Sequence, residues 1–141
     1  MIQQITNEDI FTFYHCTWWF LPNKAGKQGT KSDCEKFKTG KFLHESEGDP
    51  VMYKIERNDS IQREIIGKSG GFANFKITWR GPCSYELTFL NQHIITPDSI
   101  PESGKNLKVK VEIIKVRNDT CFVLADNGTI SLPGIVYIDK K

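Results

Sequence analysis

The stretch Val51–Leu90 decides the fold: it reads VMYKIERND-SIQREIIGKS-GGFANFKITWRGP-CSYELTFL. In its first segment the apolar and aromatic residues Val51, Tyr53 and Ile55 fall on one face, with Met52, Lys54 and Glu56 on the other. An alternation with a period of two is typical of a strand and not of a helix. Asn58-Asp59 predicts a two-residue turn, and Gly67–Gly71 and Gly81-Pro82 predict two further reversals. The stretch therefore predicts four antiparallel strands in succession.

The same pattern continues on both sides of this stretch. Further strands are expected at Cys34–Phe42, at Leu107–Val116, at Cys121–Ala125 and on both sides of Pro133-Gly134. Together these segments predict an all-β, up-and-down meander of about eight strands. Such a meander tends to close into a barrel, because closure removes the exposed edges. An open sheet curled around the N-terminal aromatic residues is the alternative.

The chain divides into residues 1–33, an aromatic extension and linker, and residues 34–141, the barrel domain. The extension contains Trp18-Trp19-Phe20, the densest apolar patch, followed by the polar segment 22–30. This patch is expected to cover or plug the sheet, with pairing to another chain or poor order as alternatives. No export signal is visible in residues 1–21, because acidic residues precede the aromatic ones. No run approaches the roughly 20 apolar residues of a membrane span.

Composition and charge argue against several function classes. The net charge of +2 and pI near 8.3 are too mild to indicate a nucleic-acid partner. A basic stripe around Lys76, Arg80 and Lys108 falls largely on the face opposite the aromatic residues, which are expected in the core. The three histidines, His15, His44 and His93, lack any paired spacing. We therefore expect no metal and no cofactor.

Four cysteines are widely spaced in the sequence: Cys16, Cys34, Cys83 and Cys121. No Cys-x-x-Cys pair occurs, which argues against a structural zinc site. Two disulfides in any of three pairings are possible, and so are four thiols in a reducing compartment. Both interpretations stay open, and Cys34 with Cys83 is the first pairing to test.

Three segments carry a resemblance to a known family: CEKFKTGKF at 34–42, IERNDSIQ at 55–62, and ITW at 77–79 followed by CSYELT at 83–88. Together they resemble a family of small uncharacterised Bacteroidetes proteins that often bears the label "DNA topoisomerase IV". The resemblance covers roughly residues 34–138. It implies a lipocalin-like barrel that is periplasmic, envelope-associated or secreted.

The residues themselves argue against topoisomerase activity. That reaction needs a large breakage-reunion core with a tyrosine nucleophile and clustered metal-binding carboxylates, and nothing here supplies a second domain or an acidic cluster. No nucleophile elbow, phosphate-cradling loop or zinc-hydrolase motif occurs either. We therefore expect a protein that is not an enzyme.

Two sets of residues are candidates for binding. Arg57 and Gln62 could form a polar rim that holds a ligand carboxylate or carbonyl at a barrel mouth. The structural alternative is that Arg57 pairs across the hairpin with Gln62 or Glu64, while Asp59 and Ser60 satisfy the turn amides. The aromatic face supplies the pocket candidates, which are Tyr53, Phe75, Trp79, Tyr85 and Phe89.

The sequence thus favours a non-enzymatic β-barrel module that binds an apolar or amphipathic small molecule. The alternative is a structural or protein-interaction module with a filled barrel, which would self-associate or join a partner through Trp18-Trp19-Phe20 or an edge strand. An apolar cavity of about 300 Å³ or more would favour the first hypothesis.

Overall fold

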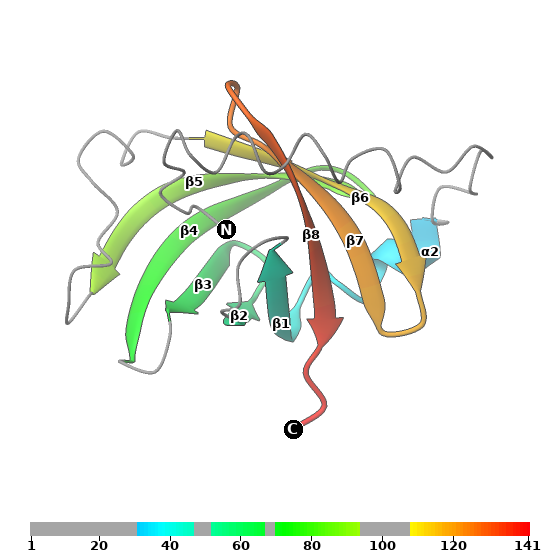
Figure 1. Cartoon of the computed structure of the whole chain (residues 1–141), viewed down its shortest axis with the longest axis horizontal. Helices are drawn as coiled ribbons and strands as arrows, with labels where there is room; N and C mark the ends of the chain where they lie inside the picture. Colours follow the sequence, from blue (N-terminus) through cyan, green and yellow to red (C-terminus); the bar gives the residue numbers. More distant parts are fainter. Residues whose placement is uncertain (1–30, 47–51, 67–69, 94–107) are drawn as a thin grey trace.

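The chain forms a closed antiparallel barrel in the computed structural model, which describes residues 31–46, 52–66, 70–93 and 108–141. The described strands follow one another around the barrel in sequence order, and β1 pairs with β8 to close it (Figure 1). The elements are α2 (Lys31–Glu35), β1 (Gly40–Ser46), β2 (Tyr53–Arg57), β3 (Ile61–Ile66), β4 (Gly71–Gly81), β5 (Ser84–His93), β6 (Lys108–Arg117), β7 (Thr120–Asp126) and β8 (Ser131–Ile138). The predicted up-and-down barrel is confirmed, and the sheet is not open.

The tight turns largely follow the sequence prediction. Arg117 pairs directly with Thr120, so Asn118 and Asp119 form a two-residue turn, and Asn118 adopts a positive φ of 54°. Asparagine tolerates this conformation better than most residues. The turn predicted at Asn58-Asp59 is displaced by one residue, because the Asn58 amide donates to the Ile61 carbonyl oxygen at 3.0 Å.

Two predicted segments differ from the structure. The expected strand from Cys34 is instead the short helix α2, and β1 begins only at Gly40, whose φ of 133° favours glycine. Between the two lies Phe37, which is fully buried. Pro133 and Gly134 do not interrupt the last strand, because Pro133 pairs with Leu124 inside a continuous β8.

Alternate residues of each strand point into the barrel, as the period of two requires. From β4 to β8 the buried side chains are almost all apolar, among them Phe75, Ile77, Leu87, Val111 and Val123. The large aromatic residues contact one another, with Phe75 and Phe89 at 5.9 Å between ring centroids. This set forms a single hydrophobic core.

The two ends of the barrel differ. One end, which we call the closed end, carries the turns at 58–60, 82–83 and 118–119, and α2 lies against it beside β6 (Figure 1). The opposite end, the far end, carries the described hairpin 127–130 and three connections that lie outside the described residues. Residues 1–30, including Trp18-Trp19-Phe20, also lie outside the described part, so the predicted role of that patch stays a prediction.

Candidate functional site

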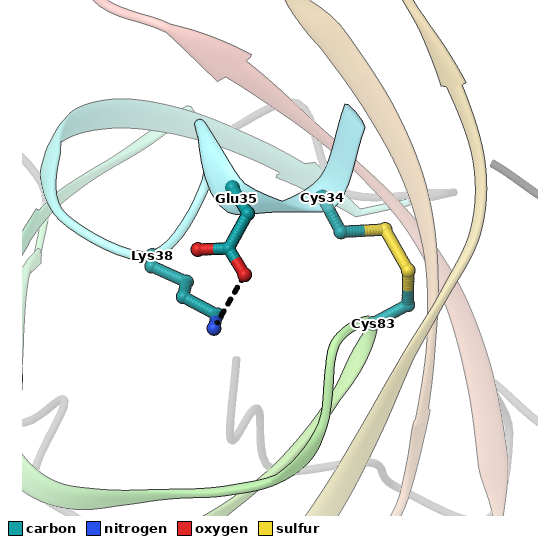
Figure 2. A network of polar contacts seen from close by, with 4 residues as sticks. All are labelled: Cys34, Glu35, Lys38 and Cys83. Carbon is teal, nitrogen blue, oxygen red and sulfur yellow. Dashed lines mark hydrogen bonds and ion pairs between the residues drawn. A yellow bond between two sulfur atoms is a disulfide. The ribbon is translucent and has the colours of Figure 1, made fainter. Parts of the chain in front are cut away.

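A disulfide fixes α2 to the closed end. Cys34 bonds Cys83 with their Cα atoms 5.3 Å apart, across 49 residues of sequence (Figure 2). The pairing that the sequence put first is therefore confirmed. On the same helix, Glu35 accepts a hydrogen bond from Lys38 at 2.9 Å, and the Lys38 ammonium also lies 5.2 Å from the ring centroid of Trp79. These contacts hold residues 34–38 over the end of the barrel and seat Phe37 inside it.

Arg57 lies inside the barrel at this closed end. Its side chain is 6% exposed and donates to three groups. Nε and Nη2 donate to Gln62 Oε1 at 2.9 and 2.6 Å, Nη1 donates to the Phe37 carbonyl oxygen at 2.6 Å, and Nη2 donates to the Tyr85 hydroxyl at 3.0 Å. The guanidinium carbon also lies 5.2 Å from the ring centroid of Phe42 and 4.7 Å from that of Tyr85. A buried charge is tolerated only with partners of this kind.

The hydrogen-bond chain continues from Gln62 towards the middle of the barrel. Gln62 Nε2 donates to Glu64 Oε1 at 2.8 Å, and Gln62 and Glu64 are 0% and 3% exposed. We call Arg57, Gln62 and Glu64 the polar track. It runs along β2 and β3 from the closed end towards the far end, because Glu64 is two residues farther than Gln62 from the turn at 58–60.

The strand register explains why these polar side chains face inward. Residues that pair directly on neighbouring antiparallel strands share a face of the sheet. Gln62 pairs with Phe75 and Glu64 pairs with Ala73, and both partners are buried. On β3, therefore, Gln62 and Glu64 point into the barrel, while Arg63 between them is exposed.

His44 belongs to the same interior region. Its imidazole is 1% exposed, close enough to interact electrostatically with Glu64, and its ring centroid lies 6.4 Å from that of Tyr53. Gly134 on β8 makes room for it, because a Cβ at that position would lie 2.7 Å from His44 Nε2. The imidazole thus occupies a place that any other residue at position 134 would obstruct.

Two further interior groups are held in their neutral forms. Burial raises the pKa of the Tyr85 hydroxyl above its usual value, although Arg57 opposes this effect. Burial likewise raises the pKa of the Cys121 thiol to about 12, again against the influence of Arg57. At neutral pH these two groups therefore add no charge to the interior, and Cys121 is an inert thiol.

The structure places the predicted pocket residues in three regions and does not gather them into one site. Trp79 and Tyr85 contact each other near the closed end, with ring centroids 4.8 Å apart. Phe75 and Phe89 pack in the core, and Tyr53 lies beside His44 at the start of β2. Phe75 and Tyr85 are fully buried, so they belong to the hydrophobic core.

The polar rim prediction for Arg57 and Gln62 is wrong in its location. Both side chains are enclosed at the closed end and bonded to each other, so the alternative of a pair across the hairpin is confirmed. The turn amides are satisfied by Asn58, whose Oδ1 accepts from the amides of Ser60 and Ile61 at 3.0 and 2.8 Å, and not by Asp59 or Ser60.

Sequence reasoning missed His44 and Glu64 as members of one interior site. For Glu64 the sequence did hold a signal. If the hairpin loop after Arg57 has an even number of residues, Gln62 and Glu64 lie on the same face of the sheet as Ile55 and Arg57. Ile55 is a core residue, and it pairs with Glu64 in the structure. His44 carried no comparable pattern, since Gly134, the glycine that leaves room for its ring, is distant in sequence.

No protein family, curated protein sequence or solved structure matches this chain. Among the described residues, no helix is long and apolar enough to cross a membrane. Within the same ranges, no three side chains of His, Cys, Asp or Glu lie together in a way that could hold a metal ion. The disulfide is compatible with a compartment outside the reducing cytosol.

Proposed function

We propose that this barrel is a non-enzymatic binding module that takes one small amphipathic molecule into its interior from the far end, in the cell envelope or outside the cell. The observation that carries the proposal is the group of polar side chains buried inside the barrel, which are His44, Arg57, Gln62 and Glu64. The closed end cannot admit a ligand, because Phe37 and the disulfide of α2 occupy it.

The distribution of side-chain size supports entry from the far end. Two inward positions towards that end carry small residues: Ala73 on β4 and Ala125 on β7. The large buried side chains of Phe37 and Tyr85 belong to the closed end. An eight-stranded barrel has an interior that is either filled by side chains or holds one small ligand. Small residues at one end favour the second case for that half.

The energetics of the polar track also support a binding role. An ionised group inside a barrel loses its hydration, and replacing buried ionic groups by apolar residues of similar volume often leaves a protein equally or more stable. Arg57, Gln62 and Glu64 are thus not required for hydrophobic closure of the barrel. Polar side chains that are kept inside the barrel without being needed for its closure support a binding role for this interior.

The interaction-module alternative has less support from the described residues. The large apolar side chains exposed there are those of Met52, Leu90 and Ile114. Leu90 and Ile114 lie towards opposite ends of the paired strands β5 and β6, so they do not form one patch. The aromatic patch of the extension lies outside the described residues.

Binding of a neutral fluorescent probe tests the proposal. N-phenyl-1-naphthylamine has an apolar body and is not charged at neutral pH, so its fluorescence should rise saturably with one site per chain. Ala73→Leu adds volume inside the barrel and should weaken binding at least about tenfold, as befits an overfilled pocket. Thr88→Leu makes a similar change on the outward-facing side of β5 and should have no effect.

Absence of saturable probe binding to the wild-type protein would overturn the proposal. So would equal weakening by the inner and outer leucine variants, because the probe would then bind the barrel surface. Native mass spectrometry of protein purified from its own host provides a second measurement. It should show an added mass of a few hundred daltons on the folded chain, within the size that an eight-stranded barrel encloses.

A further inference from the structure

Residues 34–38, which we call the cap, cover the closed end and are joined to the barrel by a covalent bond. Inside the cap, the amides of Phe37 and Lys38 donate to carbonyl oxygens three residues earlier, at 3.0 and 3.1 Å, so the local bonds close a single turn. A single helical turn is not stable in water without tertiary support. The position of the cap therefore depends on its contacts with the barrel, and one of these is the Cys34–Cys83 disulfide (Figure 2).

Phe37 makes the deepest non-covalent contacts of the cap. Its ring is fully buried, with its centroid 6.0 Å from that of the Phe42 ring, and its carbonyl oxygen accepts a hydrogen bond from Arg57 at 2.6 Å. Opening of the cap would expose the Phe37 ring, which is unfavourable. It would also return water to the Arg57 guanidinium and release the conformational entropy of the cap, and both effects are favourable. Because these effects oppose one another, the covalent bond decides whether the cap stays closed.

The two sulfur atoms of the disulfide belong to residues that differ in exposure. Cys34 is fully buried, whereas Cys83 is half-buried in the turn between β4 and β5. A thiolate of a dithiol reductant therefore attacks the Cys83 sulfur, the S–S bond breaks, and Cys34 leaves as a thiolate that takes up a proton. The second thiol of the reductant then attacks the mixed disulfide. This step frees the Cys83 thiol and leaves the reductant oxidised to its own disulfide.

We infer that the Cys34–Cys83 disulfide is a redox switch that controls access to the closed end of the barrel. While the bond is intact, the cap keeps Phe37 inside the barrel and water away from Arg57. Reduction by a dithiol lets the cap move away, and water and small solutes then reach the interior from this end. The inference goes beyond the proposed ligand binding and does not depend on it.

The thiol of Cys121 reports on this opening. It is a free cysteine that is 1% exposed, and it lies close to the turn at 118–119. Arg57 and Lys36, a residue of the cap, both influence its pKa, which places it near the closed end. A thiol is alkylated as its thiolate and only where the reagent can reach it. The rate of Cys121 alkylation by iodoacetamide therefore measures access to the interior at this end.

The first measurement concerns the disulfide in the wild-type protein. Dithiothreitol should reduce the Cys34–Cys83 bond under native conditions, while the far-ultraviolet circular dichroism remains that of the folded barrel. Trapping of the new thiols and peptide mass spectrometry identify the bond. If reduction occurs only at urea concentrations that unfold the barrel, the inference is overturned.

Alkylation of Cys121 at pH 8 then tests the cap without a reductant. The double variant Cys34→Ala, Cys83→Ala lacks the covalent bond, and peptide mass spectrometry distinguishes Cys121 from Cys16. Cys121 should react at least about tenfold faster in this variant than in the wild type, as expected for a local opening. The rate should also be nearly independent of urea well below the unfolding midpoint, because a local opening exposes little surface and global unfolding exposes much.

Gly134→Ala is the matched control, because it destabilises the barrel at another place and leaves the disulfide intact. Its Cys121 alkylation should rise steeply with urea, as expected for exposure through global unfolding. The inference is overturned if Cys121 reacts equally fast in the wild type and the double variant. It is also overturned if the rate in the double variant depends on urea as steeply as in Gly134→Ala, since the whole barrel would then be unfolding.

Discussion

Replacing Arg57 by methionine should destabilise the barrel more than any comparable change at its surface. Methionine is similar in length and apolar, so Arg57→Met leaves little cavity but removes every donor of the guanidinium. The Gln62 carbonyl oxygen and the Phe37 carbonyl oxygen then remain buried without that donor, while the Tyr85 hydroxyl can rotate. A buried acceptor left unsatisfied costs about 1–3 kcal/mol. We expect a net loss of about 3–4 kcal/mol in the free energy of unfolding, because burial of methionine offsets part of the cost.

Urea unfolding followed by far-ultraviolet circular dichroism measures this loss. Arg63→Met is the matched control, because Arg63 is exposed and makes one hydrogen bond to Asn74 at 3.0 Å and one contact with the Phe72 ring at 4.4 Å. That variant should lose less than about 1 kcal/mol. If the two variants lose similar amounts, or if Arg57→Met equals the wild type, the network at the closed end does not stabilise the fold as argued here.

Three further changes probe other parts of the structure. The double variant Cys34→Ala, Cys83→Ala should lower the free energy of unfolding by about 4 kcal/mol, since the disulfide closes a loop of 49 residues, and an unchanged urea midpoint would contradict this. The Cys121 thiol has a folded pKa of about 12 against an ordinary 9.0, so only the unfolded chain ionises as pH rises above 9. Stability should therefore be constant from pH 7 to 8.5 and then fall by up to about 1.4 kcal/mol per pH unit, with a smaller slope between pH 9 and 10 in Cys121→Ala. Gly134→Ala should cost about 1–3 kcal/mol through its clash with His44, and a double-mutant cycle with His44→Ala should recover part of that loss.

The fold could be predicted from the sequence because turns and alternation agreed with each other along most of the chain. Asn118-Asp119 and Asp126-Asn127-Gly128 both mark hairpins in the structure, and Gly128 has a φ of 89° as such a turn allows. The prediction failed at Cys34–Phe37, where the disulfide and the burial of Phe37 fix a short helix whose sequence alternates like a strand. Tertiary contacts of this kind override local preference.

The candidate site was harder to predict, because on β3 the hydrophobic residues suggest one inward face and the register of the strand gives the other. Ile61 and Ile65 look like the inward residues of that strand, yet they alternate with Gln62 and Glu64, which are buried. A strand cannot turn both sets inward, and a slip by one residue would exchange them. The hairpin that follows Arg57 sets the register between β2 and β3, and this register allows Arg57 and Gln62 to bond to each other.

That disagreement on β3 is also the strongest argument for a function inside the barrel. Natural sequences mostly satisfy local and global preferences together, and they depart from them where a site requires it. Exchanging the faces of β3 would bury Ile61 and Ile65 and expose Gln62 and Glu64, an arrangement that hydrophobic burial alone would favour. The observed arrangement instead holds a carboxylate in the interior through a chain of bonds that begins at the Phe37 carbonyl and passes through Arg57. The closed end thus fixes the position of the Glu64 side chain through Arg57 and Gln62, and a polar group held in this way is typical of a preorganised site.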